Sequence, residues 1–267
     1  MSTGKVAEKQ LKTIIIKEEP PIAWIILNRP EKLNAVNMEL LDELSKALDE
    51  VEVKDNIKVL VITGKGKAFS AGADISGFKG MKPLDALKFS RKFQEVNNKI
   101  EYYTKPVIMA LNGYTLGGGM EIAMSGDFRI AAESAKLGQP EINLGIMPGA
   151  GGTQRMARLI GMSRAKKLIY TGDMISAKEA YEIGLVDMVV PDDKLEEEVR
   201  KFAYKLAEKP PIALLTAKYA IQYGLQTDIW NGLSIEAALF SLLFSTEDYV
   251  EGVNAFLEKR KPKFKGK

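Results

Sequence analysis

Two glutamates in glycine- and proline-bearing segments are the residues of this sequence best suited to chemistry. Glu121 ends the run Gly117-Gly118-Gly119-Met120-Glu121, and Glu141 ends the run Gln139-Pro140-Glu141. The chain of 267 residues contains no histidine and no cysteine. An enzyme with this composition must transfer protons with carboxylates, lysines, tyrosines or backbone groups. A glutamate can do so where burial and neighbouring charges raise its pKa towards neutrality.

A cluster of glycines accompanies each glutamate. Three glycines at the expected start of a helix cost stability, so they indicate either close packing of another backbone or a helix N-terminus that faces negative charge. No Gly-Lys-Ser/Thr follows, so the run is not a Walker loop. A second cluster, Gly149-Ala150-Gly151-Gly152, follows Pro148. Spacing leaves open whether both clusters meet in one pocket, whether Glu121 only complements a helix dipole, and whether Glu141 is a solvated loop carboxylate.

The segment Ala71-Gly72-Ala73-Asp74 follows an apolar run and lets a ligand approach the backbone closely. Free N–H groups of such a turn can bind an anion or a developing oxyanion. Small residues also occur in turns without any ligand, so this segment alone does not decide between the two interpretations.

The composition excludes several classes of protein. A net charge of +3 is too small to favour nucleic acid, and the absence of cysteine excludes disulfides and thiolate metal sites. Without histidine, a zinc site would need carboxylates alone, so we expect no metal. Residues 1–12 are polar, unlike a secretory signal, and no apolar run reaches transmembrane length. We therefore expect a cytoplasmic protein with no membrane and no nucleic-acid partner.

Apolar patterning predicts strands that alternate with helices, which is typical of an α/β fold. The expected strands are 13–17, 22–28, 59–63, 107–111, 128–132 and 186–190. The expected helices begin after a cap at Asn37, at residue 83 and at the Gly117 run, and residues 64–80 form a long glycine-rich loop.

Helical patterns dominate after Gly151. Residues 229–244 are apolar almost all round, so either the core or a partner subunit must cover this helix. Residues 259–267 form a basic tail, which we expect to be solvated and frayed rather than bound to phosphate.

Taken in order, five motifs resemble the enoyl-CoA hydratase/isomerase (crotonase) superfamily, in particular its short-chain hydratases and 3-hydroxypropionyl-CoA dehydratases. The motifs lie at Leu27-Asn28-Arg29-Pro30 with Leu33-Asn34-Ala35, at 69–75, at 112–121, at 138–155 and at 245–260. The resemblance implies a crotonase-like spiral of ββα turns in residues 1–200 and a C-terminal helical oligomerisation region in residues 201–267. It also implies a homotrimer or a dimer of trimers.

The resemblance assigns roles to particular residues. Ala73 and Gly118 would form the oxyanion hole, Glu121 and Glu141 the acid/base pair, and Gly149 would position the water. Coenzyme A would lie along the backbone of Ala71, Gly72, Ala73, Asp74 and Ile75, with weaker candidate contacts at Lys32, Lys67, Phe240 and Lys259. Coenzyme A is part of the substrate, and no cofactor is implied.

The implied activity is reversible addition of water to a short-chain trans-2-enoyl-CoA. The nearest alternative is a Δ3,Δ2-enoyl-CoA isomerase, which needs one base and often lacks a carboxylate at the position of Glu121. A dehalogenase of this superfamily uses a histidine, which this chain lacks. An RNA-binding member is disfavoured because residues 38–55 are rich in acidic side chains. A non-catalytic member would more naturally have lost one glutamate.

Overall fold

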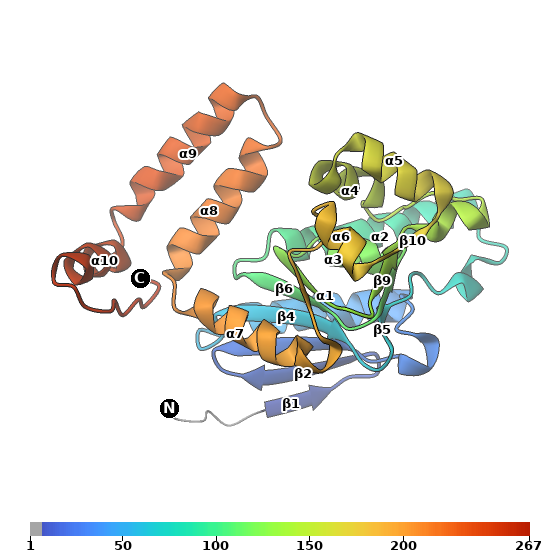
Figure 1. Ribbon diagram of the computed structural model, residues 1–267, viewed down its shortest axis with the longest axis horizontal. Helices are drawn as coiled ribbons and strands as arrows, with labels where there is room; N and C mark the ends of the chain where they lie inside the picture. Colours follow the sequence, from blue (N-terminus) through green and yellow to red (C-terminus); the bar gives the residue numbers. More distant parts are fainter. Residues whose placement is uncertain (1–6) are drawn as a thin grey trace.

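Parallel strands form the frame of the molecule in the computed structural model, which describes residues 7–267 (Figure 1). Within these residues seven strands make the larger sheet, in the order β1-β2-β3-β4-β6-β8-β11. The strands are β1 (Ala7–Gln10), β2 (Ile14–Glu19), β3 (Ile22–Leu27), β4 (Val59–Gly64), β6 (Val107–Leu111), β8 (Phe128–Ala132) and β11 (Met188–Val190). Strands β1 to β3 pair antiparallel, and every pairing from β3 to β11 is parallel.

Helices cover both faces of this sheet, so its central strands read as continuous apolar runs rather than alternating ones. Strand β6, for example, is buried at all five positions. The helices are α1 (Met38–Glu52), α2 (Pro83–Glu101), α3 (Gly118–Ala123), α4 (Gly152–Ile160), α5 (Met162–Thr171), α6 (Ala177–Glu182), α7 (Leu195–Ala207), α8 (Pro211–Gly224), α9 (Ile229–Leu243) and α10 (Glu247–Leu257). One apolar core lies between the sheet and the α1–α2 side, and a second lies under α7.

A second, smaller sheet explains how the chain winds. Its four strands within the described residues run in the order β10 (Met174–Ser176), β9 (Lys136–Gly138), β7 (Tyr114–Leu116) and β5 (Ala68–Ser70). Three strands of the large sheet are each followed by a short strand here and then by a helix: β4-β5-α2, β6-β7-α3, and β8-β9 followed by the 3-10 helix η3 (Pro140–Leu144). The α/β class and the spiral of ββα turns are therefore confirmed.

The predicted elements are confirmed except where strands are short. Helix α1 begins as expected, since the side chain of Asn37 accepts a hydrogen bond from the backbone N–H of Leu40 at 2.9 Å. The loop predicted at 64–80 instead contains β5 and the 3-10 helix η2 (Ile75–Phe78), and neither β1 nor the other small-sheet strands were predicted. Strands of three residues are too short to show an alternating pattern, and β1 is exposed at every position.

The C-terminal helices α8, α9 and α10 extend away from the two sheets (Figure 1). Helix α9 packs along α8, yet none of its described side chains is buried. Trp230 is 77% exposed and Phe240 is 60% exposed. The chain's own core therefore does not cover this apolar helix, which leaves a partner subunit as the remaining prediction.

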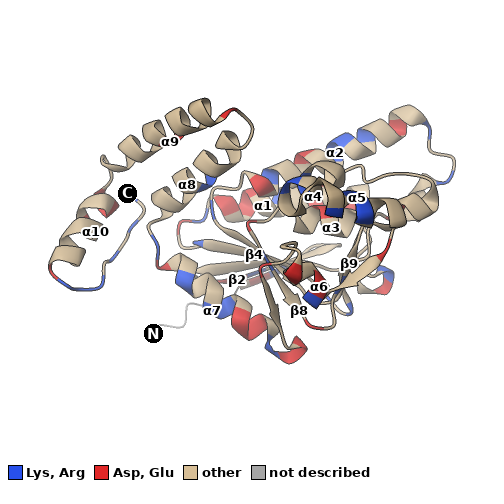
Figure 2. Cartoon of the chain, turned by 45° about the horizontal axis from the view of Figure 1, so that its top comes forward, with Lys and Arg blue, Asp and Glu red and all other residues tan. Residues whose placement is uncertain are grey.

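The prediction of a frayed basic tail is wrong. The tail turns back along α10 (Figure 2), where the buried carboxylate of Asp248 accepts hydrogen bonds from the backbone N–H groups of Lys265 and Gly266 at 2.6 and 2.8 Å. Glu251 likewise accepts the N–H of Lys263 at 2.7 Å. Acidic side chains spaced along one helix thus hold the backbone of a segment whose sequence shows only its positive charge.

No single helix among residues 7–267 has the length and apolar character needed to cross a membrane. Helices α9 and α10 meet that requirement only when taken together, and they are bent by 77° relative to each other.

A buried lysine joins the C-terminal helices to the body. Lys218 of α8 donates to the backbone carbonyls of Tyr103 and Lys105 at 2.8 and 2.9 Å, and it pairs with Asp127 at 2.7 Å. Only 9% of the lysine side chain is exposed. Asp127 also accepts the backbone N–H of Val107, at 2.7 Å. One largely buried ion pair therefore joins the start of β6 to α8.

Replacing Lys218 by methionine tests this connection. The substitution leaves Asp127 buried without its cation, so we expect the free energy of unfolding to fall by about 3–5 kcal/mol. Chemical denaturation of the variant and the wild type measures the difference. The matched control is Lys205→Met on α7, where the side chain is exposed and a change within about 0.5 kcal/mol is expected. Equal stability of both variants would contradict the assignment.

Candidate active site

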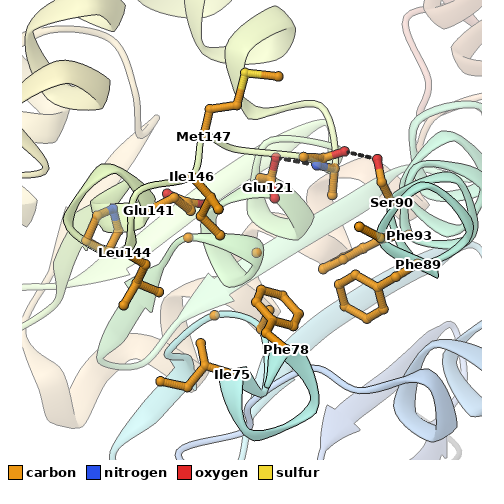
Figure 3. Close-up of a pocket in the computed structure, with 18 of the residues that line it drawn as sticks. Ile75, Phe78, Phe89, Ser90, Phe93, Glu121, Glu141, Leu144, Ile146 and Met147 are labelled. Atoms are coloured by element: carbon orange, nitrogen blue, oxygen red, sulfur yellow. Dashed lines mark hydrogen bonds between the residues drawn. The ribbon is translucent and has the colours of Figure 1, made fainter. Parts of the chain in front are cut away.

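A cavity of about 400 Å³ contains most of the residues singled out by sequence (Figure 3). Three short parallel strands direct the chain into it. Strands β5, β7 and β9 pair side by side in parallel, so their carboxyl ends lie at the same edge of the small sheet. Segments 71–73, 117–118 and 139–141 follow these three strands directly. Open parallel sheets characteristically bind ligands at this edge.

The glycine run that leads into α3 is required by close packing. Gly117 has φ +50° and ψ −125°, a conformation that favours glycine, and a Cβ there would lie 3.1 Å from Oε1 of Glu141. A Cβ on Gly119 would lie 2.2 Å from the carbonyl oxygen of Ser70, at the end of β5. The structural reason for the glycines is thus established, and the same packing brings the backbone of Gly118 to the cavity wall.

The backbone amides of Ala73 and Gly118 lie close together. Ala73 forms a parallel bridge with Val36. In this bridge the Gly72 carbonyl accepts a hydrogen bond from the Val36 N–H, and the Asp74 N–H donates to the Val36 carbonyl, both at 2.8 Å. The N–H of Ala73 takes no part in this bridge. A Cβ on Gly118 would lie 3.4 Å from the Ala73 nitrogen. Two amides in this arrangement can donate to one oxygen atom.

Glu121 lies in the first turn of α3, and only 3% of the residue is exposed. Its Oε1 accepts hydrogen bonds from the backbone N–H groups of Ala150 and Gly152, each 2.7 Å long. Burial raises the pKa of Glu121, while the two amides and the charge of Arg155 lower it in part. The two glycine clusters therefore do converge, since the second supplies the donors that hold this carboxylate.

Glu141 lies across the cavity in η3. Burial, together with the nearby negative charge of Glu121, raises the pKa of Glu141 to about 7. Gln139 is fully buried beside it. When the side-chain amide of Gln139 is oriented with its nitrogen towards Glu141, that nitrogen donates to both carboxylate oxygens, at 2.8 and 3.0 Å. The carboxyl group is thus oriented by Gln139, and burial raises its pKa towards neutrality.

The loop that carries Gly149 is held by polar side chains of α2. The Gly149 carbonyl accepts hydrogen bonds from Ser90 Oγ at 2.7 Å and from Gln94 Nε2 at 2.9 Å. Asn97, one turn further, donates to the Ala150 carbonyl at 3.0 Å. Sequence reasoning missed these three residues, although their spacing places them on one face of the predicted helix.

Three aromatic rings lie together among the residues that line the cavity (Figure 3). Phe78 meets Phe89 edge to face with ring centroids 5.6 Å apart, and Phe89 meets Phe93 in the same way at 5.9 Å. Ile75, Leu144 and Ile146 add further apolar surface. Of the described residues that line the cavity, only Glu121 and Glu141 are charged. Within residues 7–267, acidic side chains do not gather in groups of three that could hold a metal ion.

The remaining predicted site residues divide into two groups. Ala71, Gly72 and Ile75 line the cavity, whereas the side chain of Asp74 turns to Arg29 at 3.0 Å and to Ser76 at 2.6 Å. The four weaker coenzyme A candidates do not line the cavity within the part of the chain that the structure describes, and they stay predictions. They are Lys32, Lys67, Phe240 and Lys259.

The winding of the chain and this cavity define a member of the crotonase superfamily. The sequence model described as enoyl-CoA hydratase/isomerase matches residues 17–267, and the chain belongs to that family.

Several relatives are similar over nearly the whole chain. The chain is 47% identical to a crotonyl-CoA hydratase of Syntrophomonas wolfei, over 95% of this chain and 98% of the relative. It is 44% identical to a short-chain-enoyl-CoA hydratase of Clostridium acetobutylicum, over 94% and 97%. Among solved structures, an enoyl-CoA hydratase from Bacillus anthracis superimposes with a TM-score of 0.90 and 43% identity, covering 99% of this chain and all of that one.

The raised pKa of Glu141 predicts a pH-dependent cost in stability. Between its ordinary value of 4.5 and about 7, the folded protein keeps a proton that the unfolded chain has released. Stability therefore falls as pH rises through this window. Glu141→Gln removes this cost. The difference in thermal midpoint between this variant and wild type should therefore increase in favour of the variant as pH rises from about 4.5 to about 8, by the equivalent of roughly 1 kcal/mol or more.

Thermal melts across that range measure the effect, and Glu31→Gln at an exposed position is the control. A difference between Glu141→Gln and wild type that does not change with pH would contradict the environment described for Glu141.

Proposed function

We propose that the chain is an enoyl-CoA hydratase that adds water to short trans-2-enoyl-CoA thioesters and removes it from the matching 3-hydroxyacyl-CoA. The observation that carries the proposal is the geometry of one cavity. Two carboxyl groups with raised pKa values face it beside two neighbouring backbone amides, those of Ala73 and Gly118. The names of the relatives from Syntrophomonas wolfei and Clostridium acetobutylicum support the same reaction.

In the proposed mechanism the thioester oxygen accepts hydrogen bonds from the N–H groups of Ala73 and Gly118. These donors stabilise the enolate that forms when water attacks C3. Loss of one such donor from a water-excluded site typically raises the barrier by about 3–4 kcal/mol. The reaction moves only the elements of water, and coenzyme A enters as part of the substrate, so we propose no metal or redox cofactor.

The two glutamates have different surroundings, which supports different roles. One oxygen of Glu121 accepts two backbone hydrogen bonds, which offset part of the rise in its pKa that burial causes. We assign Glu121 as the base that takes a proton from the attacking water. Glu141, with a pKa of about 7, is substantially protonated at neutral pH and delivers a proton to C2. Dehydration follows the reverse path. Gly149 lines the cavity beside Glu121 and is the proposed water contact.

The aromatic end of the cavity supports a short acyl chain as substrate. We expect the edge-to-face rings of Phe78, Phe89 and Phe93, which line the cavity, to limit the length of the acyl chain. An assay panel of crotonyl-CoA, acryloyl-CoA, longer 2-enoyl-CoAs and 3-enoyl-CoAs tests both chain length and reaction type. Activity on 3-enoyl-CoA without hydration of any 2-enoyl-CoA would favour the isomerase instead.

Substitution of the two carboxylates gives a kinetic prediction. Glu121→Gln and Glu141→Gln should each lower kcat by at least about 10²-fold, which is the usual range for general acid/base groups. KM should change far less, because most of the substrate binds elsewhere. The double variant should be little worse than the slower single variant, since the residues act as a unit. Loss of the enoyl-thioester absorbance measures turnover, and near-wild-type rates for Glu121→Gln would contradict the mechanism.

We also propose that α9 lies in the subunit interface of a homotrimer, alone or in a dimer of trimers. Its apolar side chains are exposed on the single chain, and exposed apolar patches of this kind mark interaction surfaces. The cytoplasmic location and the contacts of coenzyme A with Phe240 and Lys259 stay predictions of the family resemblance.

Charged residues on α9 test the assembly. Phe240→Asp with Leu243→Asp would place uncompensated charge in an apolar interface and should dissociate the oligomer. Sedimentation at micromolar concentration measures the mass, and Lys205→Asp on α7 is an exposed control. A monomeric wild type, or an intact trimer in the double variant, would contradict the proposal.

A further inference from the structure

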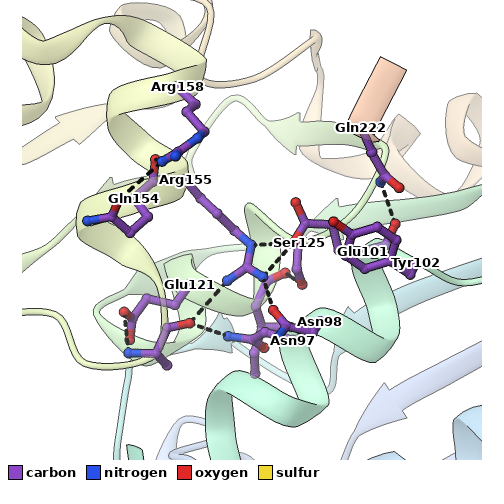
Figure 4. Close-up of polar contacts among 12 residues, drawn as sticks. Asn97, Asn98, Glu101, Tyr102, Glu121, Ser125, Gln154, Arg155, Arg158 and Gln222 are labelled. Atoms are coloured by element: carbon purple, nitrogen blue, oxygen red, sulfur yellow. Dashed lines mark hydrogen bonds and ion pairs between the residues drawn. The ribbon is translucent and has the colours of Figure 1, made fainter. Parts of the chain in front are cut away.

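An ion pair with a largely buried arginine lies directly behind the loop that holds Glu121 (Figure 4). Arg155 of α4 donates from Nε to Oε2 of Glu101 at 3.0 Å, and its Nη2 contacts the same oxygen. Only 11% of the arginine side chain and 30% of the glutamate side chain are exposed. Nη2 also donates to Oδ1 of Asn98 at 2.7 Å. The guanidinium plane is therefore fixed by two residues at the end of α2.

The remaining guanidinium nitrogen reaches the catalytic loop. Nη1 of Arg155 donates to the Ala150 carbonyl at 3.2 Å, and Asn97 donates to the same carbonyl at 3.0 Å. The N–H of Ala150 is one of the two donors to Glu121. Ala150 is thus held from one side by Arg155 and Asn97, while it holds the Glu121 carboxylate on the other.

We propose that Arg155 and Glu101 are a positioning pair that fixes the Ala150–Gly152 donors on Glu121 and sets the electrostatic field at that carboxylate. The inference rests on the proposed function, in which Glu121 takes the proton from water. Neither residue lines the cavity within the described chain, so both act through Glu121 rather than on the substrate.

The charged groups facing Glu121 come from three elements. Glu141 lies on η3, Arg155 on α4, and Glu101 on α2 behind the arginine. The arginine charge lowers the pKa of Glu121, against the larger effect of burial. Glu101 neutralises part of that charge. Removing either partner should therefore change the titration of Glu121, and the two changes should have opposite signs.

The main experiment compares Arg155→Gln, Glu101→Gln and the double variant with wild type. Arg155→Gln should lower kcat by about 10–100-fold with KM within about 3-fold, as expected for misplacement of a catalytic group. The acid limb, which is the fall in kcat at low pH, should move to higher pH. The reason is that loss of the arginine charge raises the pKa of Glu121, which must be deprotonated to act. In Glu101→Gln the limb should move to lower pH. The double variant should titrate near wild type but remain slow.

Two further variants separate positioning from folding. Arg155→Lys keeps the charge but loses the planar fork, so the acid limb should stay in place while kcat falls in part. Arg158 is an exposed arginine on the same helix whose hydrogen bonds in the described chain go only to Gln154, so Arg158→Gln should match wild type in kcat and pH profile. If Arg155→Gln does not fold, Arg155→Lys and Glu101→Gln carry the test.

A carboxyl NMR titration of Glu121 without substrate gives a readout that does not depend on activity. The inference is overturned if neither Arg155→Gln nor Glu101→Gln moves the Glu121 titration or the acid limb, or if lost activity tracks only the lowered thermal midpoint. The proposed function fails separately, if Glu121→Gln itself keeps full activity. If Glu121→Gln has a low kcat while Arg155→Gln keeps the wild-type kcat and pH profile, only the positioning role of Arg155 is rejected.

Discussion

The two backbone hydrogen bonds from Ala150 and Gly152 to Glu121 are the constraint on which the rest of the site depends. They hold one oxygen of a carboxylate that is nearly excluded from solvent. A buried carboxylate without donors would be costly, and its pKa would rise further. The loop that supplies the donors must therefore be fixed, and polar side chains of α2 and Arg155 of α4 do this through the loop's carbonyls.

The small sheet explains why distant segments meet at this carboxylate. Because β5, β7 and β9 are parallel neighbours, the segments carrying Ala73, Gly118 and Glu141 leave the sheet at one edge. In the proposed mechanism each segment contributes one group, which gives two amide donors and one carboxyl group. The glycines of the 117–119 run serve this geometry, since any side chain at Gly119 would collide with the end of β5. Close packing and an exposed backbone amide both require glycine here. The glycine run in the sequence therefore does not show which of the two requirements it meets.

Much of the fold was predictable because the long strands and amphipathic helices carry clear patterns. The three-residue strands were not, and they are the elements that place the site. Glu121 and Glu141 were identified from their neighbourhoods and from the lack of histidine and cysteine, and the family resemblance named the two amides. The roles of Ser90, Gln94 and Asn97 could not be predicted from sequence patterns, because their hydrogen-bond partners are backbone carbonyls more than fifty residues away. The returning tail was also missed, because the positive charge of its sequence does not show that its backbone N–H groups pair with acidic side chains of α10.

A crystal structure with an unreactive acyl-CoA, such as butyryl-CoA, tests the central claim most directly. The account predicts that the thioester oxygen lies about 2.7–3.1 Å from the backbone nitrogens of both Ala73 and Gly118. It also predicts that C2 and C3 lie between the carboxyl groups of Glu121 and Glu141, with the acyl end against Phe89. A thioester oxygen bound away from these amides, or an acyl chain that avoids the space between the two glutamates, would contradict the account.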